Sequence, residues 1–317
     1  MKLWSDDIEA MRPEARACVE RQLETVRAAY NSRPPLDAGA DRFERARAIR
    51  ASMPDFPAHP GGRDDVVGGV PCRRFEPSER APRAIYVHFH GGGMVVGSPE
   101  MNDFANAAFA DRHGVVVLSV RYRTAPEAPY PAPNDDALAV TRAVIATGAP
   151  RFGVNEVLLG GESAGAYLAA ATLLRLRDED GTTSRVRGVK LAYGCYDWGR
   201  TPRVDGVRPV LDAGGGAFFR ECFLPGATPE EQCDPQISPL FASLGGLAPA
   251  LISVGTEDHL LDDSLGLAAR WAAAGNDMDL FVAPDLPHSF DMYRCGITEA
   301  YAALEAAWIE ARLEGGA

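Results

Sequence analysis

Residues 3 to about 50 follow a different hydrophobic pattern from the rest of the chain. Between residues 8 and 26, apolar side chains recur at steps of three and four residues, which predicts amphipathic helices. Pro34-Pro35 is expected to interrupt this arm, and the prolines and glycines of residues 54–62 to end it as a linker. We therefore expect a helical N-terminal arm in front of a separate body.

After the linker, short apolar runs alternate with longer helical stretches. The runs that predict strands are residues 84–89, 115–120, 156–160, 189–193, 250–255 and 280–283. The stretches that predict helices are residues 102–112, 135–147, 164–177, 264–274 and 299–310. Nearly unbroken apolar strands separated by helices are typical of buried parallel sheets. The pattern therefore predicts an α/β fold with three layers, in which helices cover both faces of a mostly parallel sheet.

This alternation fails between residues 195 and 248, where glycines and prolines replace the strand and helix signals. An irregular segment of this length in an α/β fold is typically an insertion over the carboxyl ends of the strands, where ligands bind. We expect it to form a lid. The chain then divides into the arm (1–50), two parts of the core (51–194 and 249–317) and the insertion (195–248).

Composition excludes several classes of protein. Apolar residues make up 46% of the 317 residues and charged residues 24%, as in an ordinary soluble enzyme. The net charge of −12 would repel a polyphosphate, so nucleic acid is not expected as a partner. No apolar run is long enough to cross a membrane, and the acidic N-terminus does not resemble an export signal. We expect a cytoplasmic protein with no membrane partner.

The cysteines and basic residues predict no further chemistry. The six cysteines include no C-x-x-C pair, so neither a zinc site nor a redox motif is expected, and no metal is predicted. All but two of the 32 basic residues are arginine, which we interpret as a compositional bias.

The strongest chemical signal is Gly161-Glu162-Ser163-Ala164-Gly165, between an expected strand and an expected helix. A G-x-S-x-G sequence in this context forms a nucleophile elbow, because its glycines permit a turn too tight for larger side chains and the serine hydroxyl projects from the sheet. The pentapeptide alone would be a weak signal, but its position strengthens it. Ser163 is therefore the predicted nucleophile.

A serine nucleophile needs a histidine base, which follows the serine in chains with this elbow. Only His259 and His288 come after Ser163 in the sequence. His288 lies just after the last expected strand, where a loop can reach the serine. His259 adjoins the best candidate for the acid, and a carboxylate cannot readily orient its neighbour's ring toward a third group. His288 is therefore the predicted base.

The acid is expected in the loop that follows the strand at 250–255. Asp258 is predicted because it lies three residues past the end of that strand. Asp262 and Asp263 are better explained as caps of the helix expected near Ser264. A solvated loop carboxylate is the alternative interpretation of Asp258.

Acyl transfer also needs hydrogen-bond donors for the negative charge that develops on the carbonyl oxygen. His90-Gly91-Gly92-Gly93, directly after the first strand of the expected core, matches the oxyanion loop of lipases and esterases. We predict Gly92, Gly93 and Ala164 as donors, with Gly91 in support. His90 is expected to hold the loop by hydrogen bonds, and a simple flexible hinge is the alternative.

Together these motifs resemble the hormone-sensitive-lipase-like esterases, the bacterial family IV carboxylesterases with an α/β-hydrolase fold. The similarity runs from about residue 84 to 290 in family order, and it includes Tyr122-Arg123-Thr124-Ala125-Pro126-Glu127 and Ser238-Pro239-Leu240. The resemblance implies a cap built from the opening helices and the insertion. It also implies that Tyr122 and Arg123 brace the oxyanion loop.

Some residues depart from the family pattern. Glu162 replaces the usual aspartate before the nucleophile and is expected to support the site. Met94 stands where an aromatic residue usually follows the glycines, and Ser289 stands where glycine usually follows the histidine. Met94, Phe218 and Phe219 are our predicted substrate-pocket residues.

The sequence thus predicts a serine carboxylesterase that hydrolyses short- to medium-chain acyl esters through an acyl-enzyme intermediate, without a cofactor. The expected partner is a small-molecule ester, and a homodimer is left open. The same residues would serve an activated amide or a lactone. A non-catalytic small-molecule receptor on the same fold is the alternative from another class, although the joint presence of Ser163, Asp258 and His288 speaks against it.

Overall fold

A computed structural model describes residues 3–31, 40–181, 183–199 and 213–314. These residues form an eight-stranded sheet in the order β1-β2-β4-β3-β5-β6-β7-β8. The strands are β1 (Arg63–Val67), β2 (Val70–Phe75), β3 (Ala84–Phe89), β4 (Val115–Val120), β5 (Val157–Glu162), β6 (Val186–Ala192), β7 (Ala250–Gly255) and β8 (Met278–Ala283). β1 and β2 form an antiparallel hairpin that pairs antiparallel with β4, and the remaining neighbours are parallel.

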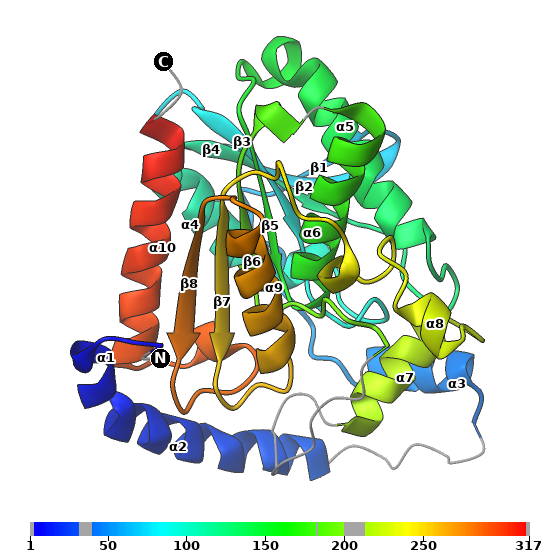
Figure 1. Cartoon of the computed structure of the whole chain (residues 1–317), viewed down its shortest axis with the longest axis vertical. Helices are drawn as coiled ribbons and strands as arrows, with labels where there is room; N and C mark the ends of the chain where they lie inside the picture. Colours follow the sequence, from blue (N-terminus) through cyan, green and yellow to red (C-terminus); the bar gives the residue numbers. More distant parts are fainter. Residues whose placement is uncertain (1–2, 32–39, 182, 200–212, 315–317) are drawn as a thin grey trace.

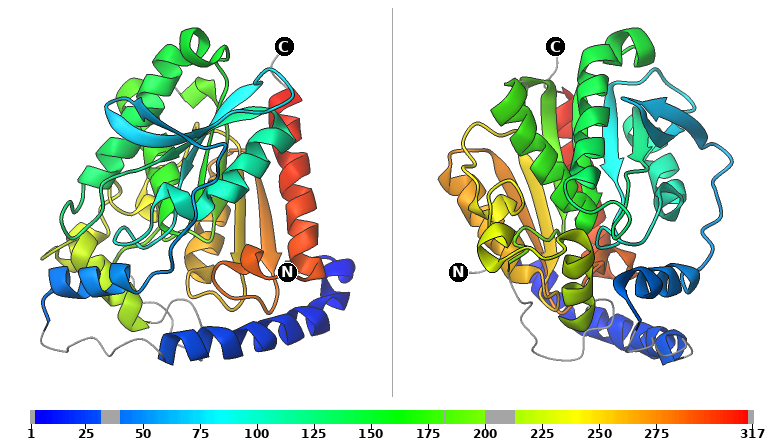
Figure 2. Two further views of the ribbon diagram at one scale, coloured as in Figure 1. Left: turned by 180° about the vertical axis from the view of Figure 1, so that it is seen from behind. Right: turned by 90° about the vertical axis from the view of Figure 1, so that its right-hand side faces the viewer.

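Helices cover both faces of this sheet (Figures 1 and 2). One face carries α5 (Ala132–Phe152), α6 (Ala164–Arg175) and α9 (Leu261–Ala273). The other carries α4 (Asp103–His113) and α10 (Gly296–Glu314). Because both faces are covered, the central strands are buried along their whole length, which explains their unbroken apolar runs. The predicted three-layer α/β fold is confirmed.

The N-terminal arm divides between two parts of the molecule. It contains α1 (Asp6–Ala10), α2 (Arg12–Asn31) and α3 (Arg42–Ala51), and Pro34-Pro35 lies outside the described residues. α1 and α2 pack against α10, and their buried face includes Ile8 and Cys18. α3 instead contacts α7 (Ala213–Phe223), which belongs to the insertion (Figure 1).

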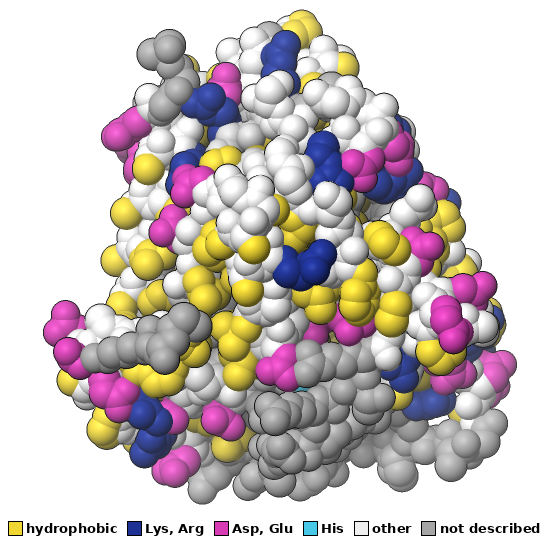
Figure 3. All heavy atoms as spheres, viewed as in Figure 1, with side chains coloured by type: hydrophobic (Ala, Val, Ile, Leu, Met, Phe, Trp, Pro, Cys, Tyr) yellow, Lys and Arg dark blue, Asp and Glu magenta, His cyan; other side chains and the backbone are white. Residues whose placement is uncertain are grey.

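The rest of the insertion and the loops contain short helices. These are η1 (Pro99–Asn102), η2 (Leu176–Asp180), η3 (Thr183–Arg185), α8 (Pro229–Gln232), η4 (Pro239–Phe241) and η5 (Phe290–Met292). Among the described helices, none has both the length and the apolar character that crossing a bilayer requires. On the face shown in Figure 3, acidic and basic side chains are interspersed with scattered apolar ones.

One prediction at a helix start is wrong. α9 begins at Leu261 rather than near Ser264, and its N-cap position is Leu260, whose side chain makes no capping hydrogen bond. Asp262 and Asp263 therefore do not cap it. The Asp263 carboxylate instead accepts hydrogen bonds from the backbone N–H groups of residues 196 and 197, at 2.8 and 2.9 Å. A contact with the distant segment after β6 thus takes the place of the expected capping hydrogen bond.

Candidate active site

Ser163 occupies the turn between β5 and α6, with φ 54° and ψ −116°. Few residues with a side chain adopt this backbone conformation, and such strain is typical of functional turns. The flanking glycines are required by close packing, because a Cβ on Gly161 or Gly165 would lie 2.2 or 1.8 Å from the carbonyl oxygen of Phe89. The sequence G-x-S-x-G therefore folds into the tight turn that holds Ser163 at the carboxyl edge of the sheet.

A chain of hydrogen bonds joins Ser163 to two residues that are distant in sequence. Nε2 of His288 lies 3.0 Å from Oγ of Ser163, and Nδ1 of His288 lies 2.8 Å from Oδ2 of Asp258. His288 is 6% exposed and Asp258 is 2% exposed. The geometry suits a neutral imidazole that donates its Nδ1–H to the carboxylate and accepts the serine hydroxyl at Nε2. The structure thus brings the three predicted residues together.

His259, the other histidine that follows Ser163 in the sequence, is not the one bonded to the serine. It is buried and lines the same cavity as Ser163, but the hydrogen bond to the serine comes from His288. The second oxygen of Asp258, Oδ1, accepts a hydrogen bond of 2.9 Å from the backbone N–H of Leu260. This bond fixes the carboxylate while its Oδ2 faces His288.

The loops after β7 and β8 run close together, which brings Asp258 and His288 to one place. A Cβ on Gly255 would lie 2.1 Å from the carbonyl oxygen of Leu286, so the two loops can approach only over a glycine. The backbone N–H of Asp285 also donates a hydrogen bond of 2.8 Å to Oγ1 of Thr256. These contacts set the separation of the predicted acid and base.

Helix α2 also holds the loop that carries His288. Nε of Arg12 and Nε of Arg16 lie 2.7 and 2.9 Å from Oδ2 of Asp285, three residues before the histidine. Asp285 has a φ of 61°, a left-handed conformation that is costly for a residue with a Cβ. Sequence reasoning did not find these contacts, because nothing local to Arg12 indicates a partner so far along the chain.

Tyr193 is a second residue that sequence reasoning missed. Its ring packs edge-on against the His288 ring, with 5.0 Å between the ring centres. Its hydroxyl donates a hydrogen bond of 2.8 Å to Oδ1 of Asp291, in the turn after His288. Tyr193 therefore packs directly against the predicted base and also fixes the turn that follows it. A tyrosine directly after β6 was the one available signal.

The glycine loop after β3 lies beside Ser163. A Cβ on Gly91 would be 3.6 Å from Cβ of Ser163, and Gly92 and Gly93 have φ angles of 121° and 60°. Together with Ala164, these glycines line the cavity. Gly93 also approaches α7 closely, since a Cβ there would lie 2.4 Å from the ring of Phe219. The loop can therefore present backbone groups to a ligand only with glycine at these positions.

His90 holds this loop from within the protein. Its Nδ1 lies 2.7 Å from the carbonyl oxygen of Gly91, and its ring stacks on Tyr122 at 4.3 Å. The Tyr122 hydroxyl donates a hydrogen bond of 2.8 Å to the His90 carbonyl. Burial lowers the pKa of His90 to about 4, so the imidazole is neutral at physiological pH.

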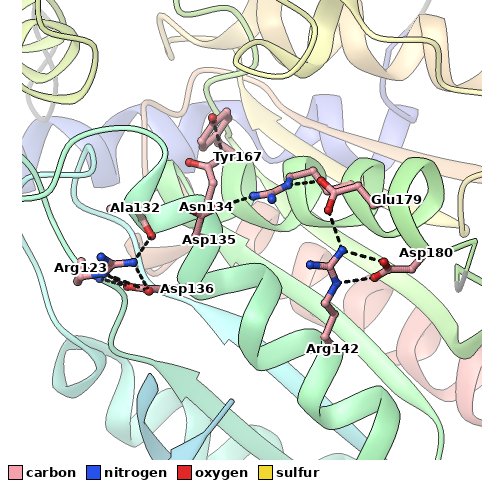
Figure 4. A network of polar contacts seen from close by, with 10 residues as sticks. Arg123, Ala132, Asn134, Asp135, Asp136, Arg142, Tyr167, Glu179 and Asp180 are labelled. Carbon is pink, nitrogen blue, oxygen red and sulfur yellow. Dashed lines mark hydrogen bonds and ion pairs between the residues drawn. The ribbon is translucent and has the colours of Figure 1, made fainter. Parts of the chain in front are cut away.

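Arg123 is placed differently from its neighbour Tyr122. Its guanidinium pairs with the carboxylate of Asp136 at 2.7 Å, and its Nη2 lies 3.4 Å from the carbonyl of Ala132 (Figure 4). The backbone N–H of Arg123 donates to the same carboxylate at 2.8 Å. Arg123 therefore fixes the start of α5 relative to the end of β4, and it is Tyr122 that contacts the oxyanion loop.

Glu162 lies under the nucleophile in a buried group of charges. Its Oε2 is 2.9 Å from Nε2 of His88, and its Oε1 is 3.7 Å from Nζ of Lys190. Lys190 in turn contacts Glu305 of α10 at 2.6 Å. Burial alone would raise the pKa of Glu162, but His88 and Lys190 more than offset this and lower it to about 2. Glu162 is therefore a carboxylate.

A cavity of about 940 Å³ contains Ser163 and His288. Beside α3 and α7 the lining is mainly apolar, with Met53 and Phe56 after α3, Trp198, and Phe219 of α7. Of the three predicted pocket residues, Phe219 lines this cavity. Phe218 is buried under the guanidinium of Arg45, at 4.3 Å, and Met94 is fully buried in the main core cluster.

The similarity to known proteins agrees with this geometry. A family profile described as alpha/beta hydrolase fold matches residues 86–292, and with the elbow it defines the class of the protein as an α/β hydrolase. An acetyl-hydrolase of Streptomyces hygroscopicus is 32% identical over 252 residues, covering 78% of this chain and 81% of the relative. The carboxylic ester hydrolase LipN of Mycobacterium tuberculosis is 32% identical over 262 residues, covering 77% and 68%.

Solved structures give the narrower class. A hormone-sensitive lipase from a metagenome library superposes with a TM-score of 0.76 at 27% identity, covering 93% of this chain and 98% of that one. The chain belongs to the hormone-sensitive-lipase-like carboxylesterases of the α/β hydrolase fold family. It is an enzyme that hydrolyses carboxylic esters, and the predicted family and enzyme class are confirmed.

Proposed function

We propose that this enzyme hydrolyses esters through a covalent acyl-enzyme in which Ser163 is the nucleophile, His288 the general base and Asp258 its orienting carboxylate. The observation that carries the proposal is the continuous pair of hydrogen bonds from Ser163 to His288 and from His288 to Asp258, at 3.0 and 2.8 Å. These distances lie within the range that proton transfer between a serine and a histidine requires. The strained backbone of Ser163 supports the same role.

The proposed reaction has two steps. Ser163 Oγ attacks the ester carbonyl while His288 takes its proton, and His288 then gives that proton to the departing alcohol. Negative charge develops on the carbonyl oxygen, and the backbone N–H groups of Gly92, Gly93 and Ala164 are the proposed donors to it. In the second step His288 takes a proton from water, whose oxygen attacks the acyl carbon and releases the acid and free Ser163.

We propose short- to medium-chain acyl esters as substrates. The apolar cap side of the cavity, with Met53, Phe56 and Phe219, supports an acyl chain that is enclosed rather than left in solvent. A relative named for acetyl hydrolysis agrees with this size range. The cap in this proposal consists of α3 and the insertion, while α2 holds the loop of the predicted base from outside through Arg12 and Arg16.

Labelling with a p-nitrophenyl phosphonate tests the nucleophile. We expect intact-mass measurement to show one adduct in the wild type and none in Ser163→Ala, with peptide mapping to the elbow. Ser289→Ala is a matched control, because Ser289 lines the same cavity next to His288 and should leave labelling intact. An adduct that persists in Ser163→Ala would show that another residue is the nucleophile.

A further inference from the structure

The cavity that contains Ser163 also reaches behind the nucleophile, between the sheet and the helices α4 and α10. Its lining includes Tyr86 and His88 of β3 and Lys190 of β6. It also includes Ala105 of α4 and Ala302 of α10. Figure 2 shows these two helices on the face of the sheet opposite α6. We name this part of the cavity the rear chamber.

Charged groups in the rear chamber remain accessible to solvent. The side chains of Glu162, Lys190 and Glu305 keep 16%, 10% and 15% of their surface exposed, although each lies between the sheet and a helix. Ionised groups between a sheet and a helix are stable when they are paired and hydrated. Here Lys190 pairs with both Glu162 and Glu305. A polar space of this kind is one that holds ordered water.

Tyr86 provides an independent indication. Its side chain is 1% exposed and lines the chamber, and its hydroxyl has no hydrogen-bond partner in the described part of the protein. A buried hydroxyl without a partner costs roughly 1–3 kcal/mol, and only a hydrogen-bonding group that comes within about 3 Å of it could remove that cost. An apolar ligand could not satisfy it. The rear chamber is therefore suited to water rather than to the acyl chain.

The outer end of the chamber reaches the protein surface. Ala105 and Ala108 of α4 are exposed, Ala302 of α10 is partly exposed, and all three line the cavity. Three of the side chains that line this end are single methyl groups, so a larger side chain at any of these positions would project into the cavity. Glu162, Ser163 and His288 all line this one cavity, so its inner end lies at the catalytic residues.

We propose that the rear chamber is the route by which water reaches the acyl-enzyme, separate from the cap side through which the ester enters. This inference rests on the proposed acyl-enzyme mechanism. Once the acyl group fills the apolar cap side, water arriving from the rear still meets the acyl carbon. The charged side chains lining this part of the cavity are the carboxylates of Glu162, Asp291 and Glu305 and the cations Lys190 and Arg112. Because the carboxylates are in excess, the chamber admits neutral water and repels the carboxylate product.

The step that uses this water is balanced without any further reactant. His288 Nε2 takes one proton from the water as its oxygen bonds to the acyl carbon, and the bond between that carbon and Ser163 Oγ then breaks as His288 returns the proton to the serine. The products are the carboxylic acid and the free enzyme.

Partition of the acyl-enzyme between water and an added alcohol tests the route. With p-nitrophenyl butyrate and a fixed concentration of 1-propanol, the wild type yields butyric acid and propyl butyrate in a measurable ratio. Ala302→Phe narrows the chamber, so we expect the ratio of propyl ester to acid to rise roughly fivefold while the rate of the p-nitrophenolate burst stays unchanged. Ala105→Phe, at an exposed position on the opposite helix, is expected to shift the ratio in the same direction.

Ala303→Phe is the matched control. Ala303 is the exposed neighbour of Ala302 on α10 and should leave the ratio at the wild-type value, with circular dichroism confirming the fold of each variant. Unchanged ratios in folded Ala302→Phe and Ala105→Phe would overturn the water route but leave the acyl-enzyme intact. The absence of a burst and of propyl ester in the wild type would overturn the acyl-enzyme, and the water route with it.

Discussion

His288 and His259 both line the cavity around Ser163, and they differ in what they contact. Because the hydrogen bond to the serine comes from His288, we expect His288→Ala to lower kcat about a thousandfold or more. His259→Ala should retain most of kcat and change mainly KM. Steady-state kinetics with p-nitrophenyl butyrate at one pH compares the two variants. Equal losses in kcat would show that the base has been assigned wrongly.

Asp258 can be tested with a nearly isosteric substitution. In Asp258→Asn the amide oxygen can still accept from Leu260, but the amide N–H₂ group would face Nδ1 of His288. The imidazole would then carry its proton on Nε2, where it cannot accept the hydroxyl proton of Ser163. We expect kcat to fall by roughly three to four orders of magnitude with little change in thermal stability. A loss of less than tenfold would contradict the orienting role.

At the scale of elements, α2 is expected to act on catalysis through the loop that carries His288. Arg12→Ala removes the ion pair with Asp285 at 2.7 Å, so the loop should move more freely and kcat should fall roughly fivefold, with KM less affected. Arg21→Ala, at an exposed position further along α2, is the control for simple loss of a surface charge. If both variants have the same kcat, the contact of α2 with this loop has no catalytic effect.

The order of the core elements could be predicted because each central strand is buried on both faces and so has a continuous apolar sequence. The hairpin of β1 and β2 could not, because its residues include Asp64, Asp65, Arg73 and Arg74, and an edge hairpin needs no apolar run. The arm was predicted as helical from its periodicity. The hydrophobic periodicity of a helix shows that one of its faces is buried, but it does not show which element buries that face. It could therefore not be predicted that α1 and α2 pack against α10 while α3 packs against α7.

In the active site, too, residues whose role depends on their sequence neighbours could be predicted, and residues whose role depends on distant parts of the chain could not. Ser163 and the glycine loop could be identified because their chemistry depends on adjacent residues, as in the two glycines that pack against Phe89. His288 and Asp258 were found from their order in the chain, and their geometry now supports the assignment. Tyr193, which packs on His288, and Asp263, which binds the backbone of residues 196 and 197, act through contacts that only the folded chain creates.

At the scale of the whole molecule, the proposed enclosure of the acyl chain beside α3 and α7 predicts a limit to acyl length. Each buried methylene adds about 0.8 kcal/mol of binding until the space is filled, after which longer chains gain nothing. Rates on p-nitrophenyl esters from acetate to palmitate should rise, reach a maximum between roughly two and eight carbons, and then fall. A maximum at dodecanoate or longer would contradict an enclosed acyl site, and Phe219 would then be the first residue to vary.

Global stability should depend on pH through His90. Its pKa is about 4 in the folded protein because of burial, against about 6.5 in the unfolded chain, so the unfolded state binds a proton first as the pH falls. The free energy of unfolding therefore decreases as the pH falls from about 6.5 to about 4. In the wild type the free energy of unfolding should therefore fall as the pH is lowered from 7 to 5. In His90→Asn this fall should be smaller by about 2 kcal/mol, as measured by urea denaturation. His59→Asn is the control, and an equal effect of both would exclude His90 as the cause.

The buried ion pair of Lys190 with Glu305 has a practical consequence for handling the enzyme. The sequence holds one other lysine, Lys2, so reagents that modify primary amines have few places to react on the folded protein. A bulky amine-directed dye, cross-linker or solid support should therefore react only slowly with Lys190 while the fold is intact, because the amine is paired with Glu305 between β6 and α10. A lysine-specific protease should likewise cleave after Lys190 only when the core opens, so that cleavage there would report unfolding.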